Sequence, residues 1–167
     1  ALRLTHSRVK SPTPSEAMSR KIASQYALIN GHLERDIVIE VNDRTITAIE
    51  HCDNIDCHAG VEFYPGILIA GMVNAHCHLE LSYLRDAISE GSGFAGFAGA
   101  IGRVRNNFSE EERLRAASTA DAIMWEEGVE AVADIANDRL VMPIKERSAI
   151  HYHTFIEFFG LNNHSVE

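Results

Sequence analysis

The sequence predicts an α/β protein in which a small all-β unit precedes alternating strands and helices. The first 70 residues contain short β-branched runs that are separated by turn residues. After residue 70 the pattern becomes strand, helix, strand, helix, strand, which is typical of a parallel sheet or a (β/α) barrel. Hydrophobic residues make up 46% of the 167 residues, enough for a globular core.

The elements expected in the β unit follow from local residue chemistry. Ser11–Arg20 is polar and contains two prolines, so we expect a surface loop. A first strand is expected at Tyr26–Ile29. Asp36–Val41 and Thr45–Ile49 are rich in β-branched residues and flank a turn, so they predict a hairpin. A further strand is expected at Val61–Tyr64.

The elements expected after residue 70 have recognisable starts and stops. Ser109 and Glu112 have the spacing of a helix capping box, and Gly128 is expected to end that helix. The other predicted elements are a strand at Met72–His78, a loose helix at Phe94–Val104, a strand at Val129–Ile135, a short helix at Val141–Arg147 with Pro143 in its first turn, and a strand at Ile150–Phe159.

Composition disfavours several classes of partner. The net charge is −9, so nucleic acid and anionic membranes are poor partners. The N-terminus has no apolar signal core and no apolar stretch is long enough to span a bilayer, so we expect a soluble cytoplasmic protein.

The three cysteines are odd in number and predict reduced thiols. We interpret His51–His58, with its two thiols and two imidazoles, as a polar loop; a structural zinc site there is an open alternative.

The most informative stretch is VNAHCHLELS, residues 73–82. His76 and His78 point to the same face if the segment is a strand, because side chains alternate with a period of two. Two neutral imidazoles on one face can share a metal ion. The preceding residues are apolar and expected to be buried, where imidazoles without partners are costly. Cys77 is expected to point the other way and pack as a small hydrophobic residue. The alternative is a pair of ordinary histidines, one of them in the core and the other hydrogen-bonded.

The segment PGILIAGMVNAHCHLELSYLRD, residues 65–86, resembles the first-strand motif of the amidohydrolase superfamily. The similarity is greatest to the deaminase and chlorohydrolase branch, in particular to aminofutalosine-deaminase-type members. Residues 91–105, 128–138 and 154–160 resemble the helix after that strand and the family's second and third strands.

The resemblance implies the N-terminal part of a (β/α)8 TIM-type barrel that follows a β-sandwich portion. Residues 1–70 would be part of the sandwich, and residues 71–167 the first three β/α units. Family members take further metal ligands and a catalytic glutamate from later strands, so the catalytic residues are expected outside this chain. We therefore expect a fragment that binds metal weakly, is inactive alone, and is completed by a missing C-terminal half or another chain, with homo-oligomers also expected.

The implied function is metal-dependent hydrolytic deamination of a small purine-like or other cyclic amidine substrate. The resemblance makes His76 and His78 ligands of a divalent metal, zinc with iron or manganese as alternatives. Glu80, Glu157 and His164 are suggested as substrate contacts. The alternatives are a salt-bridged loop carboxylate for Glu80 and a structural hydrogen bond to a neighbouring loop for Glu157. The competing hypothesis is a non-enzymatic subunit or interaction protein with the same fold.

Two further groups are interpreted as structural. Asp134, on the second predicted strand, is expected to make a hydrogen bond to a neighbouring loop. His151 and His153 form a second His-x-His pair, but they lie at the start of a strand, where a barrel carries stability rather than catalysis. No metal is expected at that pair.

Overall fold

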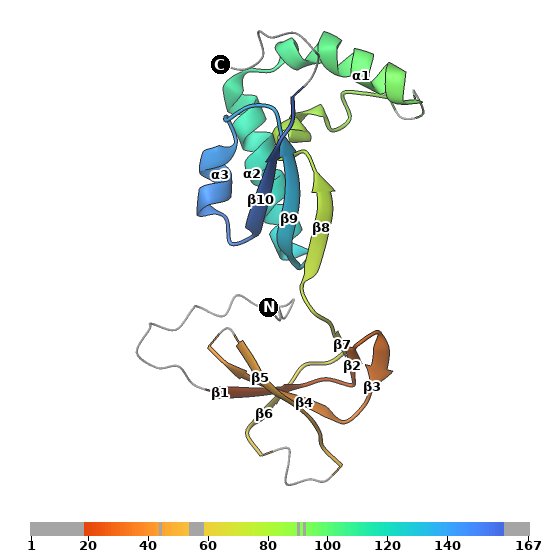
Figure 1. Ribbon diagram of the computed structural model, residues 1–167, viewed down its shortest axis with the longest axis vertical. Coiled ribbons are helices and arrows are strands. Elements are labelled where there is room, and N and C mark those ends of the chain that lie inside the picture. Colours follow the sequence, from red (N-terminus) through yellow and green to blue (C-terminus); the bar gives the residue numbers. More distant parts are fainter. Residues whose placement is uncertain (1–18, 44, 54–58, 90, 92, 159–167) are drawn as a thin grey trace. The chain divides into compact units, whose positions relative to one another are not determined.

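The computed structural model describes residues 19–43, 45–53, 59–89, 91 and 93–158 (Figure 1). The chain divides into two compact units, Ala1–Gly71 and Met72–Glu167. Within the described ranges, no helix is long and apolar enough to cross a membrane.

The first unit is a β-sandwich with two small sheets. Its strands are β1 (Ser19–Ala23), β2 (Tyr26–Ile29), β3 (His32–Glu34), β4 (Ile37–Asn42), β5 (Thr45–His51), β6 (Val61–Phe63) and β7 (Ile67–Leu68). They are arranged in the orders β5-β4-β1-β6 and β3-β2-β7. Both sheets contribute to one buried cluster, in which Ile22 and Ile39 meet Ala27 and Leu68. This shared apolar core holds the two sheets together.

The predicted hairpin is confirmed, since β4 and β5 pair antiparallel with Ile39 opposite Ile49. The loop predicted for Ser11–Arg20 is wrong at its end, because Ser19 and Arg20 belong to β1; its earlier residues lie outside the described ranges. Polar residues sit in this strand because Arg20 donates two hydrogen bonds to the Glu62 carboxylate on the neighbouring strand. The short strands β3 and β7 were not expected.

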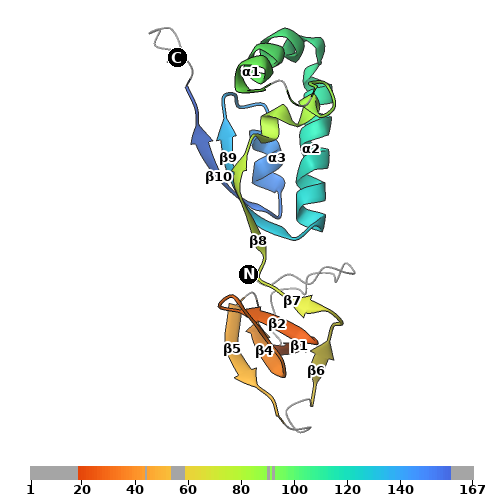
Figure 2. The ribbon, with the colours of Figure 1, turned by 90° about the vertical axis from the view of Figure 1, so that its right-hand side faces the viewer.

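The second unit is an open parallel sheet covered on one face. Its elements are β8 (Met72–Cys77), the 3₁₀ helix η2 (Leu79–Leu84), α1 (Gly93–Val104), the 3₁₀ helix η3 (Arg105–Asn107), α2 (Glu110–Glu126), β9 (Val129–Ala136), α3 (Met142–Arg147) and β10 (His151–Ile156). The strands pair in parallel in the order β10-β9-β8. Figure 2 shows α2 and α3 on one side of this sheet.

Local sequence explains where these elements start. Ser109 caps α2 through a complete capping box with Glu112, and Pro143 lies in the first turn of α3, as predicted. Buried side chains between the sheet and the helices include Leu79, Ala117 and Val141. The last strand is shorter than predicted and ends at Ile156, while the end of the predicted range, Phe159, lies outside the described residues.

The opposite face of the sheet is open. Val73 is 67% exposed and Phe155 is 51% exposed, whereas Val132, on the helix face of β9, is 1% exposed. The expectation of a buried first strand is therefore wrong for this face. The physical reason is that no element among the described residues packs on it (Figure 2).

Gly128 joins the end of α2 to the sheet and generates a stability prediction. Its φ is +92°, and its carbonyl accepts the N–H of Met72 at 2.9 Å. Gly128→Ala should lower the free energy of unfolding by about 1–2 kcal/mol, because L-residues are strained at positive φ. Urea unfolding followed through the fluorescence of Trp125, the only tryptophan, measures this. Gly102→Ala, in α1 with open space around the site, is the matched control and should be neutral or stabilising; equal losses in both variants would contradict the interpretation.

Candidate metal-binding site

The two central histidines lie side by side where β8 ends. His76 is the second-last residue of β8, and His78 directly precedes η2. Their ring centroids are 5.3 Å apart, with an angle of 62° between the planes. Two imidazoles on one tetrahedral zinc, with Zn–N bonds of about 2.1 Å, have centroids roughly 5 Å apart. The observed separation therefore fits two ligands of one ion.

His78 also carries an unsatisfied polar atom. Its Nδ1 is buried and has no hydrogen-bond partner among the described residues. Buried polar atoms without partners are rare and call for an explanation such as an ion. The donor set thus fits a divalent metal in its chemistry as well as its spacing.

For a metal site, this pair would be an incomplete set of ligands. Within the described ranges, no group of three or more histidine, cysteine, aspartate or glutamate side chains is placed to hold a metal ion. Protein metal sites normally use three or four protein ligands. As metal ligands, the two imidazoles would therefore need further donors beyond those that the described residues place beside them.

A bulge, as well as strand alternation, places the rings. Asn74 pairs with Val132 and Cys77 with Asp134, so three steps along β8 match two steps along β9. The side-chain amide of Asn74 donates to the Met124 sulfur on α2, and its oxygen accepts the His76 N–H at 3.2 Å. A simple period of two would put Asn74 on the same face as His76 and His78. Because of the bulge, Asn74 instead faces α2.

Cys77 lies on the helix side of the sheet, as predicted, and packs against the apolar cluster there. Burial, together with the nearby carboxylate of Asp134, raises the pKa of its thiol to about 11. The thiol is therefore neutral near pH 7. Because Cys77 packs on the helix side, the potential metal donors that remain on the open face at the end of β8 are the imidazoles of His76 and His78.

Glu80 is 4% exposed and follows the histidine pair. Its Oε2 accepts the backbone N–H groups of Asn137 at 2.9 Å and Asp138 at 3.0 Å. Burial raises the pKa of the Glu80 carboxyl, while these two donors act in the opposite direction. The contact ties η2 to the loop after β9; a substrate contact by Glu80 stays a prediction.

Glu157 and Asn137 meet at the carboxyl ends of β9 and β10. The Asn137 amide donates to the Glu157 carbonyl at 2.9 Å, and the Glu157 N–H donates to the Ala136 carbonyl at 3.0 Å. Asn137 was not singled out from the sequence, although its position directly after a buried strand was a usable signal. A substrate role for Glu157 stays a prediction, and His164 lies outside the described residues.

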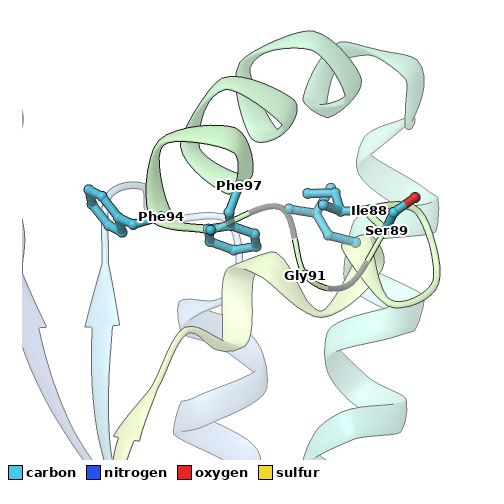
Figure 3. Close-up of a pocket in the computed structure, with 7 residues that line it drawn as sticks. Ile88, Ser89, Gly91, Phe94 and Phe97 are labelled. Atoms are coloured by element: carbon cyan, nitrogen blue, oxygen red, sulfur yellow. The ribbon is translucent and has the colours of Figure 1, made fainter.

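An apolar hollow lies beneath the start of α1, and α1 itself lies beyond the carboxyl ends of β8 and β9 (Figure 1). The volume of the hollow is about 440 Å³. Figure 3 shows the ring of Phe97 directed from α1 toward the segment after η2. The lining residues are Leu84, Ile88, Ser89, Gly91, Gly93, Phe94 and Phe97. Most of the side chains that line this hollow are apolar.

The other histidine and cysteine groups differ from this pair. His153 makes an edge-to-face contact with Phe155 in β10, with ring centroids 4.6 Å apart. Cys52 is buried against Ala23 and Val38 in the first unit. The remaining members of the alternative zinc motif, Cys57 and His58, lie outside the described residues.

No protein-family model and no curated protein matches the chain. Solved structures do. Helicobacter pylori aminofutalosine deaminase in complex with methylthio-coformycin matches with a TM-score of 0.73 and 23% identity, over 84% of this chain and 36% of that one. The chain therefore shares the fold of the part of this deaminase that it covers.

Two further solved structures that match this chain contain zinc. An adenosine deaminase from Xanthomonas campestris with bound zinc matches with a TM-score of 0.55 and 17% identity, over 80% of this chain and 33% of that one. Atrazine chlorohydrolase from Arthrobacter aurescens complexed with zinc gives 0.59 and 18%, over 81% and 35%. The chain spans about a third of the length of each match, which corresponds to an N-terminal, partial barrel.

The environment of Cys77 predicts slow alkylation. Because its raised pKa of about 11 leaves little thiolate at pH 8, iodoacetamide should modify Cys77 far more slowly than a free thiol of pKa near 8.5. The rate should rise about tenfold per pH unit from 7 to 9.5. Peptide mass spectrometry measures this at single-residue resolution. A rate that levels off below pH 9 would show that the thiol is not shielded in this way.

Proposed function

We propose that His76 and His78 are two ligands of a divalent metal ion, most simply zinc, in a hydrolase of the amidohydrolase type. The observation that carries this proposal is the 5.3 Å separation of the two rings at the end of β8. The buried, unpartnered Nδ1 of His78 supports it. Zinc in two structures of the same fold supports the choice of metal.

The proposed reaction is hydrolytic deamination of a small cyclic amidine. Its support is the fold shared with proteins described as aminofutalosine and adenosine deaminases. A divalent ion at the histidine pair would lower the pKa of water and supply a nucleophile at neutral pH. The imidazoles of this chain would hold that ion, while the apolar hollow beneath α1 would exclude water from one side of the substrate.

The remaining ligands and the acid–base group are proposed to come from further barrel strands. Two imidazoles alone make a weak site. Glu80 and Glu157 lie at the same carboxyl end of the sheet and are proposed substrate contacts. Under this proposal, the chain supplies the first part of an active site.

The second candidate is a subunit without catalysis of its own. It is favoured by the open face of the sheet, where Val73 and Phe155 are more than half exposed. Large exposed apolar faces mark surfaces that a partner covers. Light scattering of the purified chain distinguishes a monomer from self-association.

Zinc titration of matched variants tests the metal site. His76→Ala and His78→Ala should each weaken zinc binding by at least roughly tenfold, a loss that even indirect changes around a metal site can produce. His151→Ala and His153→Ala are the controls, because they remove a second His-x-His pair at the other end of the sheet. Isothermal calorimetry and a zinc-competing dye give the dissociation constants.

Other outcomes would decide against the proposal. Zinc binding that survives both substitutions but is lost in Cys52→Ser would place the metal in the first unit. An ammonia-release assay with adenine-type substrates should show no turnover by the 167-residue chain alone. Substantial turnover would contradict the need for further strands.

A further inference from the structure

Asp134 is a buried charge in an apolar strand face directly behind the histidine pair. Its neighbours on the helix face of β9, Val132 and Ala136, are 1% and 0% exposed, and Asp134 itself is 0% exposed. Burying a carboxylate costs several kcal/mol unless it is paired and hydrogen-bonded. An apolar residue would fill this position without that cost, so the presence of a carboxylate here calls for a structural or functional explanation.

Both oxygens of this carboxylate are engaged. Oδ1 accepts the backbone N–H of Leu79 at 2.7 Å. Oδ2 forms an ion pair with the Nζ of Lys145 on α3, whose side chain is 3% exposed. Lys145 also donates to the Thr154 hydroxyl on β10 at 3.1 Å. The pair thus links β9, α3 and β10 to one backbone N–H of the turn after β8.

That N–H belongs to the peptide between His78 and Leu79. The carbonyl of the same peptide accepts the N–H of Leu81 at 2.9 Å. The peptide plane is therefore held at both ends, and His78 has φ −127° and ψ 77°. The preceding residue, Cys77, is held in the ladder with β9. Holding the peptide after His78 as well fixes ψ of His78 and therefore the direction in which its Cα–Cβ bond leaves the backbone.

We propose that Asp134 is a positioning residue, which Lys145 holds in place, that orients His78 toward His76 for metal binding. Asp134 lies on the opposite side of the sheet from the open face and acts through the Leu79 N–H. This inference rests on the proposed function for its metal-binding consequence. Its geometric part, the placing of the ring, can be measured without metal.

Two charge-free double variants isolate the contact. D134N/K145M keeps an acceptor oxygen for the Leu79 N–H, whereas D134L/K145M replaces it with an apolar group of similar shape. Both remove the buried pair together, a change that proteins often tolerate, whereas removal of one partner leaves an isolated charge. Asp121→Asn is the control, because Asp121 accepts the Tyr152 and Ser148 hydroxyls elsewhere on the helix face.

The first readout is the nuclear Overhauser effect between ring protons of His76 and His78 in the metal-free chain. The second is the dissociation constant for zinc, and urea unfolding reports stability separately. We expect D134L/K145M to lose the ring contact and bind zinc roughly tenfold more weakly, while D134N/K145M and Asp121→Asn retain both.

The outcomes separate this inference from the proposed function. Equal ring contacts and equal zinc affinities in the two double variants would overturn the positioning role, even if their stabilities differ. A ring contact that depends on the acceptor, in a chain that binds no zinc in any form, would support the positioning role and reject the proposed metal site.

Discussion

The pairing of β8 with β9 is the constraint on which the second unit depends. It places Cys77 opposite Asp134 and forces an extra residue into β8 just before. The extra residue lets Asn74 reach α2 while the imidazoles reach the opposite face. A regular ladder would put Asn74 on the histidines' face and separate it from Met124. The bulge therefore lets one short strand serve the apolar helix layer and the candidate site together.

Polar contacts from the neighbouring strand then fix the segment that follows. Asp134 holds the peptide after His78, and Glu80 is held by two N–H groups beyond the end of β9. These contacts lie on both sides of the turn into η2. Because they come from buried or half-buried groups, water competes with them less than it does at an exposed loop. The histidine pair consequently projects from a turn that the second strand organises.

Sequence reasoning reached the elements with strong local signals and missed those that depend on tertiary contacts. The capping box at Ser109 and the hairpin of β4 and β5 were predictable from nearby residues alone. β1 was missed because its polar Arg20 is explained by Glu62, a residue 42 positions away. The closeness of His76 and His78 was predictable from alternation. The bulge at Ala75–His76 and the ion pair of Asp134 with Lys145 were not, because each depends on register or on a distant helix.

The arrangement also bears on how the proposed pair of histidine ligands could be ordered before any further ligands are present. Ordering a side chain costs conformational entropy, and a metal ion that has to order both rings would lose that part of its binding free energy. Here the backbone around His78 is already fixed by contacts on the helix side, and the His76 N–H is held by Asn74. The backbone of the proposed site is therefore preorganised by the fold of this unit. Preorganisation of this kind would make the free energy of metal binding depend less on ordering β8, so an ordered turn is compatible with the proposed pair of ligands.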